Sequence, residues 1–168
     1  GRTLTFYHTL GHARHHQVIH DPASRGVFSG DALGIRFNSL GRLLGRDYIL
    51  PSAPPPEFDP PAAVVMLDRL SGLGLEHVYF THFGKASGAG DILSRNKELV
   101  RFFESVGRQV LDSGGGAAEV EEILWEHVMQ ELARHGAVDR EHPAVKFLAL
   151  DMRLNAAGIV HYLEKNKS

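Results

Sequence analysis

Residues 9–16 of the chain read Thr9-Leu10-Gly11-His12-Ala13-Arg14-His15-His16. The residues before them alternate between apolar and polar side chains, with Leu4 and Phe6 as apolar members. This period of two is typical of a half-buried strand. We therefore expect a strand that runs directly into His12, which then lies where the strand gives way to a loop.

Two later motifs occupy the same kind of position. Ser29-Gly30-Asp31 follows the second arm of an expected hairpin, and Thr81-His82-Phe83-Gly84 follows a short apolar run at residues 77–80. Strand ends that meet at one edge of a sheet bring the residues after them together, which here means two imidazoles and a carboxylate. Zinc sites are commonly built from that mixture of ligands. We predict that His12, Asp31 and His82 are metal ligands.

Asp31 has a second predicted role. A carboxylate can bridge two ions about 3.5–4 Å apart and hold a hydroxide nucleophile between them. Asp31 is therefore also the predicted catalytic residue, which holds the nucleophile and shuttles its proton. The alternative is that the three residues are ordinary turn residues. A shared centre requires their side-chain tips to lie within about 10 Å of one another, whereas turn residues need not converge.

Further residues are assigned from their place along the chain. His16, four residues after His12, is interpreted as a structural residue or as one that orients a ligand. Arg36 and Phe58 are predicted to lie on segments that line the mouth of a pocket. They belong to an irregular stretch, residues 32–61, which is either a functional loop or a plain linker.

The composition excludes several classes of protein. The chain has 168 residues and a formal net charge of −2, with no cysteine, so disulfides and thiolate zinc sites are excluded. Acidic and basic residues are interspersed, and nothing indicates a polyanionic partner. No apolar run reaches the roughly 18 residues that a membrane span needs, and no signal-peptide pattern opens the chain. We expect a soluble, cytoplasmic protein with no membrane partner.

The remaining elements follow from turns, caps and periodicity. The sequence predicts a hairpin over residues 17–29, a helix that Asp59 caps and Gly72 or Gly74 ends, and a strand at residues 77–80. Three helices follow: one capped by Asp91, one that stops near residue 136, and one that starts around Pro143. Gly158 inside the last helix indicates close packing there. This order predicts a mixed α/β layer followed by helices.

The three motifs, in this order and with these gaps, resemble the third, fourth and fifth motifs of the metallo-β-lactamase-fold hydrolases. The third motif of that family usually reads Thr-Pro-Gly-His, so Leu10 departs from it mildly. Pro56-Glu57-Phe58-Asp59-Pro60 and Leu154-Asn155-Ala156-Ala157-Gly158 also resemble a branch of simple hydrolases in the family. The resemblance implies that His12 completes the first metal site, that Asp31 bridges both ions, and that His82 belongs to the second site.

The resemblance also implies the fold class. We predict an α/β chain (α+β in terms of layers) that forms half of an αβ/βα metallo-β-lactamase-type sandwich, followed by a C-terminal helical region. Residues 1–90 are expected to be the C-terminal half of the metallo-β-lactamase-like domain, and residues 91–168 the helical region. The helices are expected to pack on the sandwich and narrow the mouth of the site.

One departure from the family is an absence. The motif His-x-His-x-Asp-His, which supplies further ligands to both ions, does not occur in this sequence. We therefore expect this chain to be a fragment of a longer protein and, on its own, an incomplete and poor hydrolase. A separate chain that carries the N-terminal half is less expected, because half a sandwich exposes apolar sheet. A homo-oligomer is a further alternative.

These observations predict a metal-dependent hydrolase of small-molecule substrates. A metal-bound hydroxide would attack the carbonyl of an ester, thioester, lactone or amide. Two zinc ions are expected in the intact protein, although iron or manganese would suit the same ligands. One alternative is a phosphodiesterase or nuclease-like member of the fold, although the near-neutral charge argues against a nucleic-acid substrate. The other is a non-catalytic module for binding or oligomerisation.

Overall fold

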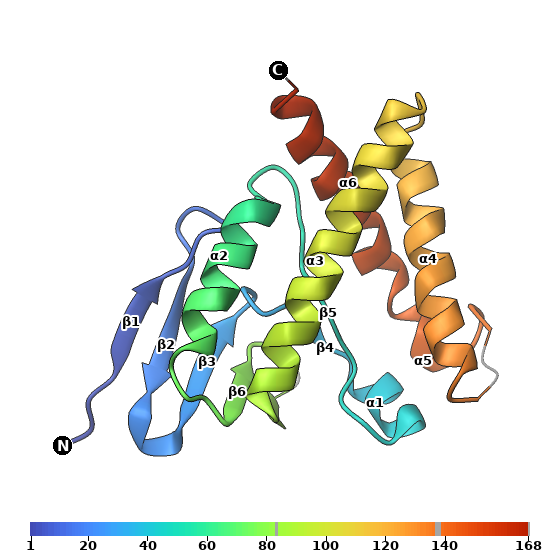
Figure 1. Cartoon of the computed structure of the whole chain (residues 1–168). Coiled ribbons are helices and arrows are strands. Elements are labelled where there is room, and N and C mark those ends of the chain that lie inside the picture. The colour runs from blue at the N-terminus through green and yellow to red at the C-terminus, as the bar shows by residue number, and fades with distance from the viewer. Residues whose placement is uncertain (83, 137–138, 168) are drawn as a thin grey trace.

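A five-stranded mixed sheet forms one part of the computed structural model, which describes residues 1–82, 84–136 and 139–167 (Figure 1). The strands lie in the order β1-β2-β3-β6-β7. Their bounds are β1 Thr5–His8, β2 Gln17–Asp21, β3 Gly26–Gly30, β6 His77–Phe80 and β7 Gly84–Ser87. The pair β3–β6 is parallel, and the other neighbours are antiparallel.

The predicted hairpin is present as β2 and β3. Its turn is a 3-10 helix, η1 Pro22–Ser24, and the side chain of Asp21 accepts hydrogen bonds from the Ala23 N–H (3.2 Å) and the Ser24 hydroxyl (2.6 Å). Arg2 also pairs with Asp21, which ties the start of the chain to this turn. An Asp-Pro turn of this kind sets the register of the two strands that it joins.

Helices α2, Pro60–Ser71, and α3, Ala89–Asp112, cover one face of the sheet (Figure 1). As predicted, Asp59 caps α2: its Oδ1 accepts the Ala62 N–H at 3.0 Å, and Gly72 follows the last turn. The apolar layer between helices and sheet buries the following side chains: Val18, Val27, Val78, Met66, Leu67, Leu70 and Leu93. This layer anchors the strands whose ends carry the predicted ligands.

The opposite face of the sheet is open. The strand register places Phe6 beside Ile19, Ile19 beside Phe28, and Phe28 beside Tyr79, so these residues form one row across four strands. Phe6 is 57% exposed and Phe28 is 45% exposed, and the rings of Phe28 and Tyr79 stack with centroids 4.7 Å apart. We call this row the open sheet face. Its exposure is what one half of a two-sheet sandwich presents.

The helical region packs around a second apolar core. Helices α4, Ala117–Ala133, and α6, Ala149–Lys165, pack against α3 and against each other, and a short helix, α5 Pro143–Lys146, precedes α6. Helix α3 contributes Leu93 to the sheet core and Phe103 to this second core. The division of the chain at residue 90 stays a prediction. None of the helices in the described ranges combines the length and apolarity that crossing a membrane requires.

Two helix predictions were wrong in detail. Helix α3 starts at Ala89 with Gly88 as its N-cap, and Asp91 lies in the first turn instead of capping it. The single helix expected from Pro143 is two helices, α5 and α6. The helical spacing of apolar residues continues through residues 147–148, so the sequence does not reveal that the helix is interrupted there.

The stretch predicted as irregular contains short elements. Strands β4, Ile35–Arg36, and β5, Ile49–Leu50, pair antiparallel, and helix α1, Asn38–Leu44, lies between them. Strand β7 occupies a glycine-bearing segment for which the sequence predicted no strand. Elements of two to seven residues are too short to show a period, and the glycines within them suggested loop.

The C-terminal helix α6 holds residues 51–53 by buried contacts. The side chain of Asn155 accepts the Ala53 N–H (2.7 Å) and donates to the Pro51 carbonyl (3.0 Å). A Cβ at Gly158 would lie 1.8 Å from the Ala53 carbonyl oxygen, so only glycine allows this approach. The close packing predicted at Gly158 is confirmed, and its partner is the backbone of residues 51–53.

Candidate metal centre

The three predicted ligands converge at one edge of the sheet. Strands β1 and β3 both run antiparallel to β2, and β6 runs parallel to β3, so their carboxyl ends share an edge. His12 lies in the loop after β1, Asp31 directly follows β3, and His82 follows β6. His12 Nε2 is 3.8 Å from Asp31 Oδ2, and His82 Nε2 is 3.4 Å from Asp31 Oδ1. The expected convergence is therefore observed, on both oxygens of one carboxylate.

The hydrogen bond of His12 determines which nitrogen faces Asp31. Its Nδ1 lies 3.1 Å from the Ser52 carbonyl oxygen, which can only accept, so Nδ1 carries the hydrogen. In the neutral ring Nε2 then presents a lone pair towards Asp31. This is the tautomer that metal-ligating histidines commonly adopt.

His16 holds the backbone of Asp31 in place. The Asp31 backbone N–H donates to His16 Nε2 (3.1 Å), and His16 Nδ1 donates to the Thr9 hydroxyl (3.0 Å). Burial, and then the neighbouring His12, lowers the pKa of His16, which favours the neutral ring that can accept this hydrogen bond. The approach depends on Gly30, whose φ is +51° and whose added Cβ would lie 2.4 Å from His16 Nε2.

Asp31 Oδ1 provides the test of whether a metal suits these residues. This oxygen is buried, and no described residue donates a hydrogen bond to it. A buried carboxylate oxygen without a hydrogen bond is costly, and the Nε2 atoms of His12 and His82 lie 3.8 and 3.4 Å from the same carboxylate. A cation is the partner that suits this donor set.

The set is nevertheless incomplete. Within the ranges that the structure describes, no group of three or more histidine, cysteine, aspartate or glutamate side chains is arranged to hold an ion by itself. The residues present therefore suit part of a metal centre. This agrees with the absence of a His-x-His-x-Asp-His segment from the sequence.

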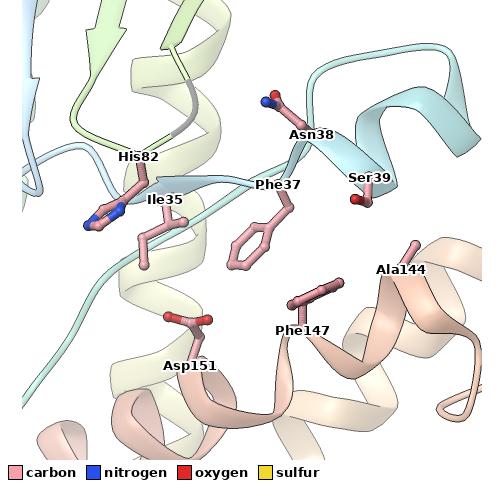
Figure 2. A pocket seen from close by; sticks show the side chains of 8 residues that line it. All are labelled: Ile35, Phe37, Asn38, Ser39, His82, Ala144, Phe147 and Asp151. Atoms are coloured by element: carbon pink, nitrogen blue, oxygen red, sulfur yellow. The ribbon is translucent and has the colours of Figure 1, made fainter.

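A pocket of about 310 Å³ opens beside His82 (Figure 2). One wall comes from β4 and the start of α1, and the other comes from helices α5 and α6. The lining residues are Ile35, Phe37, Asn38, Ser39, His82, Ala144, Phe147 and Asp151. The C-terminal helices therefore border the site, as the sequence predicted.

Arg36 and Phe58 are predicted to lie on segments that line the mouth of a pocket, and only the segment of Arg36 borders this pocket. Arg36 pairs with Asp47 (2.7 Å), and its neighbour Phe37 lines the pocket instead. Phe58 is buried and contributes to a different hollow, next to Gly11. Both predictions rested on the segment and not on the direction of the side chain. Phe83 of the Thr-His-Phe-Gly motif lies outside the described residues.

Three contributors could not be identified from the sequence. Ser52 orients His12 through its backbone carbonyl, which carries no side-chain signal. Phe147 and Asp151 come from the helical region, more than sixty residues beyond His82 in the sequence. Only the packing of the C-terminal helices brings them to the pocket.

Comparison with known proteins identifies the family and the fold. The family model of the metallo-beta-lactamase superfamily matches residues 1–93. A metallo-beta-lactamase family protein from Thermus thermophilus superimposes with a TM-score of 0.62 at 18% identity, over 98% of this chain and 45% of that chain. An archaeal metallo-beta-lactamase superfamily protein from Sulfolobus tokodaii gives a TM-score of 0.53 at 23% identity, over 95% of this chain and 46% of that chain.

The chain thus spans slightly less than half the length of both solved structures. At these identities the likeness concerns the fold alone. A search of curated proteins found no match. The predicted architecture, half of an αβ/βα sandwich followed by helices, is confirmed. Since the family model covers more than half of its 168 residues, the chain belongs to the metallo-beta-lactamase superfamily.

Proposed function

We propose that this chain contributes to a metal-dependent hydrolase that acts on the carbonyl group of an ester, thioester, lactone or amide. The observation that carries the proposal is the approach of His12 Nε2 and His82 Nε2 to the two oxygens of Asp31. Membership of the superfamily supports hydrolysis as the type of reaction.

His12, Asp31 and His82 would hold the ions, with Asp31 between the two. Zinc suits imidazole and carboxylate ligands, and iron or manganese would suit them too. When bound, such ions acidify a coordinated water and polarise a carbonyl oxygen. The remaining ligands would come from residues outside these 168, in the N-terminal half of the domain. The length of the two solved relatives, about twice that of this chain, supports this division.

The chain's own residues would act by position and by proton transfer. Asp31 would orient the attacking water and accept its proton on the carboxylate that lies between His12 and His82. Ser52 keeps the ring of His12 in the ligating tautomer, and His16 fixes the backbone of Asp31. The pocket beside His82 receives the part of the substrate beyond the scissile bond.

The test uses the full-length protein and two matched substitutions. Asp31→Ala removes the shared carboxylate, whereas Asp68→Ala removes an exposed carboxylate of α2 whose pair with Lys97 contributes little. We expect close to two metal ions per wild-type chain and hydrolysis of a simple thioester or aryl ester. Asp31→Ala should lower kcat/KM at least about 100-fold and reduce the metal content, while Asp68→Ala should change neither. Full activity and metal content in Asp31→Ala would refute the assignment.

A further inference from the structure

The pocket beside His82 has an unusual combination of walls. Phe37 and Phe147 bring aromatic rings from opposite sides, and the carboxylate of Asp151 enters from α6 (Figure 2). Phe147 is 69% exposed although it is a large aromatic residue, so contact with the rest of the chain does not explain it. Apart from His82, Asp151 is the only ionisable side chain among the described lining residues.

Asp151 has no charged partner in a salt bridge among the described residues, although its place at the start of a helix favours an acid. It lies in the first turn of α6 and is half-buried. A half-buried carboxylate that lines a pocket and has no ion pair of its own is suited to a positively charged ligand.

We propose that this pocket binds a positively charged amine or quaternary ammonium group of the substrate, between the rings of Phe37 and Phe147 and against Asp151. Ring faces attract organic cations, and a carboxylate adds a full opposite charge. The volume of about 310 Å³ suits a small head group. The proposal rests on the proposed function and names its substrate class: a carbonyl compound, such as an ester or thioester of an amino alcohol or aminothiol, that carries a cation beyond the scissile bond.

The same walls disfavour an anionic group. The described lining residues include no lysine or arginine, and a phosphate or carboxylate would face Asp151 with like charge. A phosphodiester whose anionic part must enter this pocket is therefore a poor candidate.

Binding can be tested without the chemistry. The probes are choline and its uncharged tert-butyl isostere, added to metal-depleted full-length protein and followed by calorimetry and by the aromatic NMR signals. We expect choline to bind at least about tenfold more tightly than the isostere. Asp151→Asn, which keeps the shape, should abolish that preference, and Phe147→Leu should weaken it. Glu164→Gln, an exposed acid on the same helix, should leave it unchanged.

The hydrolysis of acetylthiocholine and of its tert-butyl isostere provides the second readout. We expect kcat/KM to favour acetylthiocholine in the wild type and to show no preference in Asp151→Asn. Equal binding of the two probes, or a preference that survives Asp151→Asn, overturns the cation pocket. So does an Asp151→Asn protein that loses metal and activity equally on both substrates, because Asp151 then acts on His82. Choline-selective binding without any hydrolysis would refute the proposed function and leave the pocket standing.

Discussion

His12, Asp31 and His16 show how few atoms of the candidate centre are still available. The hydrogen of His12 Nδ1 is engaged by Ser52, and that of His16 Nδ1 by Thr9, while the Asp31 N–H is engaged by His16. What remains are the Nε2 lone pair of His12 and the carboxylate of Asp31, which face each other. Each of these hydrogen bonds fixes the orientation of the group that makes it. A cation is then the partner that suits the remaining lone pair and carboxylate.

A substitution at Gly30 tests whether the close approach of His16 to the backbone matters. Gly30→Ala places a methyl group 2.4 Å from His16 Nε2 at a left-handed φ of +51°. Gly74→Ala is the matched control, because its φ is +63° and its Cβ would meet nothing within 4 Å. Both substitutions should cost about 1–2 kcal/mol of unfolding free energy for backbone strain, measured by urea denaturation. Gly30→Ala should cost more and should also weaken metal binding. Equal effects of the two would show that the contact with His16 is unimportant.

The three ligand candidates could be predicted from the sequence because each follows a short apolar run. The hydrogen-bond partners that orient them could not be predicted, because the sequence does not show where a backbone carbonyl points. Ser52 lies forty residues after His12, inside a proline-rich stretch that suggested extended chain. No local motif distinguishes Asp151 from the acidic residues that are common in the first turn of a helix.

At the scale of elements, α6 connects the helical region to the centre. Asn155 holds the backbone on both sides of Ser52, and the Ser52 carbonyl holds His12. The motif Leu154-Asn155-Ala156-Ala157-Gly158 thus has a physical reason: an amide that satisfies two buried backbone groups, and a glycine that lets the chain approach. A helix more than 100 residues away from His12 in the sequence therefore fixes the orientation of that imidazole.

Asn155→Ala should expose this connection. It leaves the Ala53 N–H and the Pro51 carbonyl buried without partners, at a cost of roughly 1–3 kcal/mol for each group. We expect lower stability in urea and, at temperatures where the protein stays folded, a 10- to 100-fold weaker metal affinity, about the loss seen when a ligand's supporting partner is removed.

Asn166→Ala is the control for that experiment, since Asn166 only donates to the exposed Tyr162 carbonyl at the end of the same helix. It should change neither quantity. A stable Asn155→Ala protein with unchanged metal affinity would show that Ser52 does not depend on α6.

The long elements could be predicted at this scale, and the short ones could not. Helix α2 begins and ends where Asp59 and Gly72 indicated, because caps and apolar period agree there. Helix α1 and strands β4, β5 and β7 depend on tertiary contacts, such as the Phe37 N–H on the Tyr48 carbonyl (2.8 Å), that no local pattern contains. Strand β4 and the start of α1 form one wall of the pocket, so that wall could not be predicted either.

In the molecule as a whole, helices cover only one of the two faces of the five-stranded sheet in the described residues. Helices α2 and α3 cover that face (Figure 1). On the open sheet face, Phe6 and Phe28 are exposed to solvent. Apolar patches of this kind mark interaction surfaces or aggregation risks. The alternation in residues 2–8 predicted the strand, but alternation alone does not show which face of the sheet a helix will cover.

The isolated chain should therefore bind an apolar dye and associate with itself as its concentration rises. Phe28→Ser should reduce dye fluorescence without unfolding, measured with circular dichroism as the check on folding. Val65→Ser, on the outer surface of α2 and 69% exposed, should not reduce it.

The isolated chain should also be a poor hydrolase. Efficient turnover by these 168 residues with stoichiometric metal would contradict the view that the centre is incomplete.

A dinuclear metal centre shared by His12, Asp31 and His82 would be visible in anomalous diffraction from crystals of the full-length protein, recorded on both sides of the metal absorption edge. We expect two peaks about 3.5–4 Å apart, both beside the Asp31 carboxylate. One peak should lie about 2.0–2.2 Å from His12 Nε2, and the other at that distance from His82 Nε2. Metal peaks bound elsewhere, with these three side chains hydrogen-bonded only to protein or water in an active crystal, would contradict the shared centre.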